Sequence, residues 1–238
     1  MQYDNPAGRL HAILTELIAF PDQSQARDAW GKVFRLPKGE LGHVLAEKVA
    51  RTMLLPYEAV AMLNDDHPEL HDVSPSWVSR VVSGLISHNV HGTMETLKRH
   101  VTPDVLVDLR MTAAMLQKGS RRKLLSEDNL EQIRVKVSDL LAEVLNSDID
   151  EQVKVYLVRS LRKILIAVEE YQLTGATALL ENVEQMLGHA GVDAEYKSFL
   201  VDTELGKKVL DTLGVAGNLM TVAVGLPQLA MSWQALLA

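Results

Sequence analysis

Residues 126–173 read SEDNLEQIRVKVSDLLAEVLNSDIDEQVKVYLVRSLRKILIAVEEYQL. Apolar residues recur three and four positions apart in two long runs, which is the pattern of amphipathic helices. Only a few residues around Asn146 and Ser147 separate the runs, so the two helices must fold back on each other. We therefore predict a long antiparallel hairpin over residues 126–173, closed by Gly175. The expected buried positions are Leu130, Ile133, Val137, Leu140, Leu141, Val144, Leu145, Val153, Tyr156, Leu157, Leu161, Ile164, Leu165, Val168 and Tyr171.

The same helical spacing extends to both ends of the chain, and no extended apolar–polar alternation is bounded by Asn-Gly or Asp-Gly turns. This pattern predicts an all-α protein, a multi-helix bundle of about nine to eleven helices with the hairpin at its centre. Pro56 predicts a kink or a break into two helices, and residues 194–210 are expected to form one helix. The expected helix N-caps are Asn5 followed by Pro6, Asp22 or Ser24, Ser126 and Asp148.

A polar, glycine-containing and basic segment, KGSRRK, occupies residues 118–123. It predicts a linker between an N-terminal helical region, residues 1–118, and a C-terminal helical region, residues 124–238. The second region contains the hairpin and an apolar tail over residues 212–238. One continuous domain is the alternative. The basic run could touch nucleic acid or an anionic membrane, but no aromatic residue is interleaved for base stacking, which favours a solvated linker.

Composition narrows the possible classes of protein only slightly. The chain has 238 residues, of which 47% are apolar, and it contains no cysteine. The lack of cysteine excludes a disulfide scaffold, a cysteine-ligated metal site and a thiol nucleophile. The net charge of −7 argues against nucleic acid as a partner, because phosphate neutralisation requires a basic surface. No secretory signal is visible after Met1, so we expect the protein in the cytoplasm.

Histidine is the one reactive residue type that clusters in the sequence. Five of the eight histidines lie between residues 67 and 100, close to four carboxylates. Imidazole and carboxylate groups together suit zinc, manganese or iron, so a metal-dependent hydrolase or nuclease using residues 65–100 is the enzyme alternative. Solvated or capping side chains in polar connections are the favoured interpretation, and a pH-sensitive patch is the third. The residues concerned are His67, His71, His88, His91 and His100, with Asp65, Asp66, Glu69 and Asp72.

The C-terminal residues differ from the rest of the chain. Residues 212–238 carry no formal charge and are mostly apolar, and Gly225-Leu226-Pro227 should divide them into two short helices. A small-residue stripe, Gly214, Asn218, Thr221 and Gly225, would let another helix approach closely. Three interpretations remain open: core packing or an oligomer contact, a membrane-active segment that inserts on a trigger, and a permanent anchor. The residues predicted to make the interaction or membrane contact are Leu213, Gly217, Met220, Val224, Gly225, Pro227 and Trp233.

Three motifs resemble a family of all-helical bacterial hypothetical proteins of about this length. They are Gly8-Arg9-Leu10 with Ile13-Leu14, residues 29–34 (AWGKVF), and the hairpin from LNSD at 145–148 through AVEEY at 167–171 to Gly175. The resemblance covers parts of residues 5–190 and supplies no catalytic residues. It implies an association with mobile elements or phage defence.

The sequence as a whole favours a non-enzymatic helical interaction protein over an enzyme. It contains no phosphate-binding loop, no dinucleotide-binding glycine motif, no His-Glu-x-x-His and no Gly-x-Ser-x-Gly. We expect no catalytic residues, no cofactor and no metal. The expected partner is another protein or a second copy of the chain, with attachment to the inner-membrane surface as the alternative. A role in phage defence is what the resemblance adds.

Overall fold

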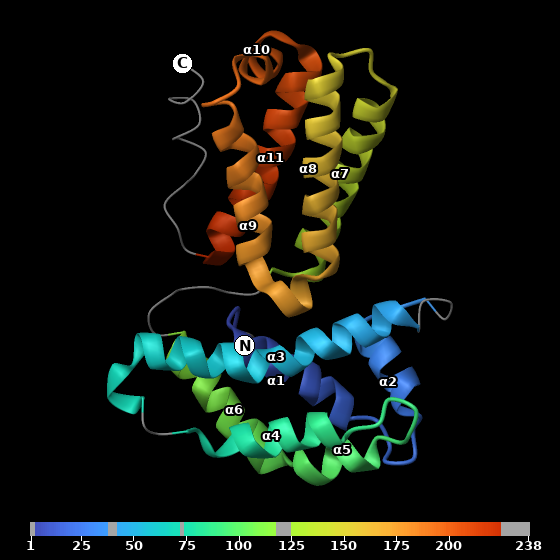
Figure 1. Cartoon of the computed structure of the whole chain (residues 1–238), viewed down its shortest axis with the longest axis vertical. Coiled ribbons are helices and arrows are strands. Elements are labelled where there is room, and N and C mark those ends of the chain that lie inside the picture. The colour runs from blue at the N-terminus through green and yellow to red at the C-terminus, as the bar shows by residue number, and fades with distance from the viewer. Residues whose placement is uncertain (1–2, 38–41, 72–73, 118–124, 225–238) are drawn as a thin grey trace. The chain divides into compact units, whose positions relative to one another are not determined.

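The computed structural model describes residues 3–37, 42–71, 74–117 and 125–224, with no side-chain description for residues 221–224. These residues form eleven α-helices and a short 3-10 helix, and they contain no strand beyond an isolated bridge between Gln25 and Thr93 (Figure 1). The all-α prediction is confirmed for this part of the chain.

The chain divides into two compact units, Met1–Arg122 and Lys123–Ala238. Unit 1 contains seven helices: α1 (Pro6–Ile18), α2 (Ala26–Val33), α3 (His43–Asp66), the 3-10 helix η2 (Pro68–Leu70), α4 (Ser76–Ser87), α5 (Glu95–His100) and α6 (Pro103–Leu116). Unit 2 contains α7 (Glu127–Asn146), α8 (Glu151–Glu169), α9 (Tyr171–His189), α10 (Ala194–Asp202) and α11 (Glu204–Val224).

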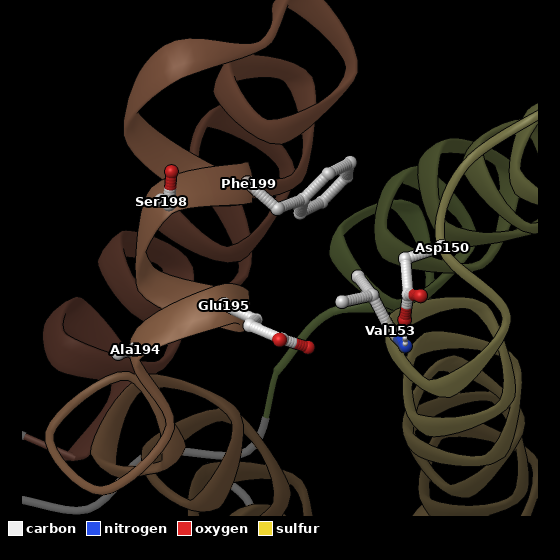
Figure 2. Close-up of a pocket in the computed structure, with 6 residues that line it drawn as sticks. All are labelled: Asp150, Val153, Ala194, Glu195, Ser198 and Phe199. Atoms are coloured by element: carbon white, nitrogen blue, oxygen red, sulfur yellow. Dashed lines mark hydrogen bonds between the residues drawn. The ribbon is translucent and has the colours of Figure 1, made fainter.

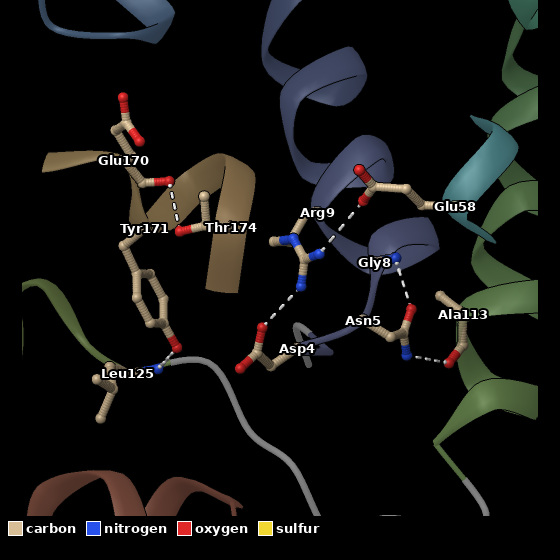
Figure 3. Close-up of polar contacts among 10 residues, drawn as sticks. All are labelled: Asp4, Asn5, Gly8, Arg9, Glu58, Ala113, Leu125, Glu170, Tyr171 and Thr174. Atoms are coloured by element: carbon tan, nitrogen blue, oxygen red, sulfur yellow. Dashed lines mark hydrogen bonds and ion pairs between the residues drawn. The ribbon is translucent and has the colours of Figure 1, made fainter. Parts of the chain in front are cut away.

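Helix α1 lies at the centre of unit 1, where it packs against α6, α3 and α2. Its leucines are fully buried and so are the two tryptophans of the unit. Asn5 caps the helix as predicted, because its Oδ1 accepts from the Gly8 amide at 2.9 Å (Figure 3). The same side chain also donates to the Ala113 carbonyl of α6 at 3.0 Å. One buried amide therefore both starts α1 and ties it to α6.

The start of α2 differs from the prediction. The helix begins at Ala26 after Gln25, without a side-chain cap, so neither Asp22 nor Ser24 is the N-cap. Both residues are held by the segment after α4 instead: the Ser24 carbonyl accepts from the amide of Met94, and the Asp22 carbonyl accepts from that of Glu95. These long-range hydrogen bonds keep both residues outside the first turn of α2.

Pro56 does not divide α3 into two helices. The helix is continuous over its 24 residues with Pro56 inside it, so of the two expected outcomes, a kink or a break into two helices, the break is wrong. An interior proline costs about 3 kcal/mol. Leu55, Pro56 and Ala59 are all buried, and burying the apolar face of a long helix compensates for the lost hydrogen bond.

The predicted hairpin is confirmed as α7 and α8, which pack against each other in unit 2. Helix α9 packs on α8, α11 packs on α7 and α9, and α10 contacts α8 and α11. In Figure 1 the helices α7, α8, α9 and α11 run side by side and α10 lies at one end of them. Unit 2 is therefore a four-helix bundle with a short fifth helix across one end.

One of the two predicted caps of the hairpin is correct. Ser126 caps α7 through a capping box with Asn129. Helix α8 is capped by Asp150, whose Oδ1 accepts from the Gln152 and Val153 amides, and not by Asp148. A capping side chain must reach the second or third amide of its helix, and α8 begins at Glu151, too far from Asp148 for that contact.

The end of the hairpin uses two turns. Helix α8 ends at Glu169, α9 begins at Tyr171, and Gly175 interrupts α9 with φ 68 and ψ −166. This positive φ favours glycine. The Tyr171 hydroxyl accepts from the Leu125 amide at 2.9 Å, which attaches the start of α9 to the residue before α7 (Figure 3).

The predicted single helix over residues 194–210 is wrong, because Thr203 divides it into α10 and α11. The Thr203 hydroxyl donates to the Phe199 carbonyl and accepts from the Gly206 amide, so it ends one helix and caps the next. A Cβ on Gly206 would lie 2.1 Å from the Phe199 carbonyl oxygen, so this crossing requires glycine. Helix α11 then continues through Gly214 to Val224.

Candidate functional site

The C-terminal apolar run begins inside the core of unit 2. Leu213 and Met220 have no exposed surface and Gly217 is buried, in line with Val209 and Ala216 along α11. Val224 is the last residue of α11, and its side chain is not described. The predicted positions Gly225, Pro227 and Trp233 lie outside the described residues. The structure therefore brings together three of the seven predicted contact residues, on one buried stripe.

Two members of the predicted small-residue stripe, Gly214 and Asn218, lie on a different face of α11; the side chain of Thr221 is not described, and Gly225 lies outside the described residues. Asn218 is exposed, and a Cβ added to Gly214 would have no described atom within 4 Å. The described part of the chain therefore places no helix close to Gly214. In that same part of the chain, no helix is both long and apolar enough to cross a bilayer.

The histidine-rich region has separate local contacts. The Nδ1 atom of His67 lies 3.1 Å from the Glu69 carboxylate on the surface. His88 is buried, and its Nε2 accepts from the Trp30 indole at 2.9 Å. Among the residues that the structure describes, no three metal-binding side chains come together. Asp72, one of the predicted carboxylates, lies outside them.

The Trp30–His88 pair has a defined protonation state. Because Nε2 accepts, the neutral ring carries its proton on Nδ1, and that atom is buried without a hydrogen-bond partner in the described structure. Burial lowers the pKa of His88 below its ordinary value. Residues 30 and 88 are 58 positions apart, so no sequence pattern could have revealed the contact.

A hollow of about 480 Å³ lies between the N-terminal ends of α8 and α10 (Figure 2). Val153 and Phe199 form its apolar part, and both are buried. Asp150 already caps α8, and the Ser198 hydroxyl donates to Asp202 at 2.7 Å. The remaining lining residues are Ala194 and Glu195. The acidic residues lie at helix N-termini, where a carboxylate is stabilised by the helix dipole.

A cluster of aromatic rings joins α8, α9 and α10. The Tyr156 and His189 rings stack with centroids 3.9 Å apart, and Tyr196 meets Tyr156 edge-on at 5.0 Å. The His189 Nε2 atom lies 3.3 Å from the Asp193 carboxylate. Burial raises the pKa of Tyr156 and of Tyr196 above the ordinary value. Both phenols are therefore neutral at physiological pH, and their rings pack against each other.

Helix α3 has apolar side chains on two opposite faces. One face is in the core of unit 1 and includes Leu45, Leu55 and Leu63. On the opposite face, Leu54 is 55% exposed and Tyr57 is 59% exposed. We name this face the outer stripe of α3; its exposed members are Ala46, Ala50, Leu54, Tyr57 and Ala61.

The outer stripe is uncharged along four turns of the helix. Its members are spaced four, four, three and four residues apart, so they project from one side of α3. Met53 and Val60 border the stripe and are partly buried. A helix that is apolar on two opposite faces is normally covered on both. Sequence reasoning missed this stripe, although its spacing is visible in the sequence.

Charged side chains lie along one edge of the outer stripe. The Arg51 guanidinium is 2.8 Å from the Glu47 carboxylate on the same helix. The Glu58 carboxylate is 4.0 Å from the Arg9 guanidinium, which also contacts the buried Asp4 at 3.1 Å (Figure 3). An apolar centre with a charged edge is the usual composition of a protein–protein interface.

No known protein family matches the chain, and neither a curated protein nor a solved structure does.

Proposed function

We propose that this protein is a non-enzymatic helical interaction protein, which acts by binding another protein chain through the outer stripe of α3. The observation that carries the proposal is the exposure of Leu54 and Tyr57, more than half of each side chain, on a stripe without charge. Helix-to-groove and helix-to-helix recognition use side chains at this spacing. A role in phage defence is part of the proposal and rests on the sequence resemblance alone.

Residues 225–238 are proposed to add a second contact. They continue the uncharged run that begins in α11, and that helix attaches them to the core through Leu213 and Met220. For the part of the run in α11, core packing is favoured over release to a membrane or to a partner. Withdrawing α11 from the core would expose Val209, which precedes the run, together with Leu213 and Met220, at roughly 1.5–3 kcal/mol each. The sum is comparable to the whole stability of a typical domain.

Thiol labelling in cells tests the proposal without knowledge of the partner. The chain has no cysteine, so Leu54→Cys introduces a unique thiol. Ile86→Cys is the matched control, because Ile86 is also in unit 1 and is 70% exposed. In dilute purified protein both thiols should react with a maleimide at similar rates. In cells that produce the protein at its natural level, the thiol at position 54 should be protected and the control should not.

Equal labelling of the two positions in cells would contradict the proposal. Thermal unfolding of both variants must match that of the unsubstituted chain, since a partly unfolded unit 1 would also change the labelling rate. Flotation with vesicles of phosphatidylcholine and phosphatidylglycerol provides the membrane test. If the full chain floats with the vesicles and the chain truncated after Val224 does not, residues 225–238 bind the membrane and not a protein partner.

A further inference from the structure

We propose that the outer stripe of α3 binds the same stripe of a second copy of the chain, with the two helices antiparallel about a two-fold axis level with Leu54. This inference rests on the proposed function and names the partner. It uses only described residues of unit 1 and does not involve the C-terminal residues.

The spacing of the stripe is self-complementary in this register. With the axis between positions 54 and 55, residue n of one helix is level with residue 109 − n of the other. Tyr57 of the second copy then falls between Ala50 and Leu54, and its Ala61 falls between Ala46 and Ala50. Leu54 of the second copy falls between Leu54 and Tyr57, so the large side chains meet at the centre, the alanines lie opposite each other at the two ends, and the two ridges interdigitate in the manner of packed helices. The two-fold axis repeats every contact.

The charges at the edge of the stripe select the antiparallel arrangement. Arg51 and Glu58 are seven residues apart, two helical turns, so they lie on the same edge of α3. In the proposed register Arg51 is level with Glu58 of the second copy, and the contact occurs twice. Within one copy these side chains contact Glu47 and Arg9, but they are 39% and 50% exposed, so both can also contact the second copy. In a parallel two-fold pair the charged edge of one helix would lie beside the opposite edge of the other helix, where Met53 and Val60 lie, so the Arg51–Glu58 pairs could not form.

The size of the stripe predicts a weak and reversible dimer. The distance from Ala46 to Ala61 is about 22 Å at 1.5 Å rise per residue. One helix pair of this length buries less surface than the roughly 1,200–2,000 Å² of a standard interface. We therefore expect a dissociation constant in the micromolar range, and a monomer at nanomolar concentration.

Solution mass tests the dimer directly on the purified full chain. Between about 1 and 100 µM the weight-average mass should rise from 26.3 kDa towards twice that value. The double variant Leu54→Glu/Tyr57→Glu should weaken association by at least about tenfold, because it places charge in the centre of the contact. Ile86→Glu, at a 70% exposed position of the same unit, should leave association unchanged. A mass of one copy at every concentration would overturn the proposal.

Charge exchange tests the register. Arg51→Glu and Glu58→Arg should each weaken self-association, since each creates two like-charge pairs across the axis. A one-to-one mixture of these two variants should associate more tightly than either alone, because every cross-pair then has opposite signs. A mixture no tighter than its components would rule out the antiparallel register. Thermal unfolding identifies any variant whose effect comes from a loss of stability, and such a variant is replaced by Arg51→Gln or Glu58→Gln.

A cross-link separates this inference from the proposed function. Leu54→Cys should form a disulfide between copies under mild oxidation, since the two positions are adjacent at the axis, and Ile86→Cys should not. Protection of position 54 in cells without dimerisation or cross-linking of the pure protein would show that a different protein occupies the stripe. In that case the proposed interaction function is supported, and the proposal that the partner is a second copy of the chain is wrong. Loss of both protection and dimerisation would overturn both.

Discussion

Replacing Leu213 by alanine tests whether α11 belongs to the resting core of unit 2. The side chain has no exposed surface and lies in the cluster formed by α7, α8, α9 and α11. A buried leucine replaced by alanine loses about 2–5 kcal/mol, from lost transfer free energy and from the cavity that remains. We expect a loss of about 3 kcal/mol in the free energy of unfolding of unit 2.

The assay is urea denaturation followed by circular dichroism at 222 nm, with a thermal scan on the same samples. For a unit of this size, about 3 kcal/mol lowers Tm by roughly 10–15 °C. Leu145→Ala in α7 is the matched control. The sequence pattern predicted Leu145 to be buried, but the structure leaves it 46% exposed, so the same atoms are removed from an exposed side chain. That variant should lose no more than about 1 kcal/mol.

A loss for Leu213→Ala no larger than that of the control would refute the reasoning. It would mean that α11 contributes little to the core, and that the uncharged run is available for release onto a membrane or a partner. A large loss with an unchanged denaturant slope would show that unit 2 still unfolds as one cooperative structure that includes α11.

Three further outcomes are expected. Truncation after Val224 should leave unit 2 as stable as in the full chain. Truncation after Asp211 should unfold unit 2, because this truncation removes Leu213 and the rest of the α11 stripe from the core. Equal Tm values for the two truncations would contradict this expectation. Unit 1 should lose stability as the pH falls below 6.5, the ordinary pKa of histidine. Burial lowers the pKa of His88 in the folded state, so the unfolded chain takes up the proton first. Stability profiles from pH 4 to 8 that coincide for His88→Gln and the unsubstituted chain would exclude this pH dependence. Asp150→Ala should lower the free energy of unfolding, measured by urea denaturation, by about 1 kcal/mol, and Asp148→Ala should leave it nearly unchanged. The reverse order would show that Asp148 caps α8, as predicted from the sequence.

The part of the fold that sequence reasoning predicted depends on contacts within a few residues. Asn5 and Ser126 each bond an amide three residues ahead, so the residue type and its position suffice to place the helix start. The hairpin follows from two long apolar stripes and a short connection, which leave the chain no other way to bury both. Predictions from neighbouring residues were wrong where a distant segment forms the hydrogen bonds. Ser24 was a predicted cap of α2, but its carbonyl accepts from the Met94 amide.

The sequence by itself determined the all-helical class, the hairpin and the uncharged C-terminal run, because helical periodicity and charge are properties of neighbouring residues. Only the tertiary structure decided which apolar stripes are buried. The stripe of α11 is in the core, whereas Leu54 and Tyr57 on the outer stripe of α3 are exposed, although both stripes have the same spacing. A stripe becomes core or surface according to which helices pack beside it, and that depends on the whole chain.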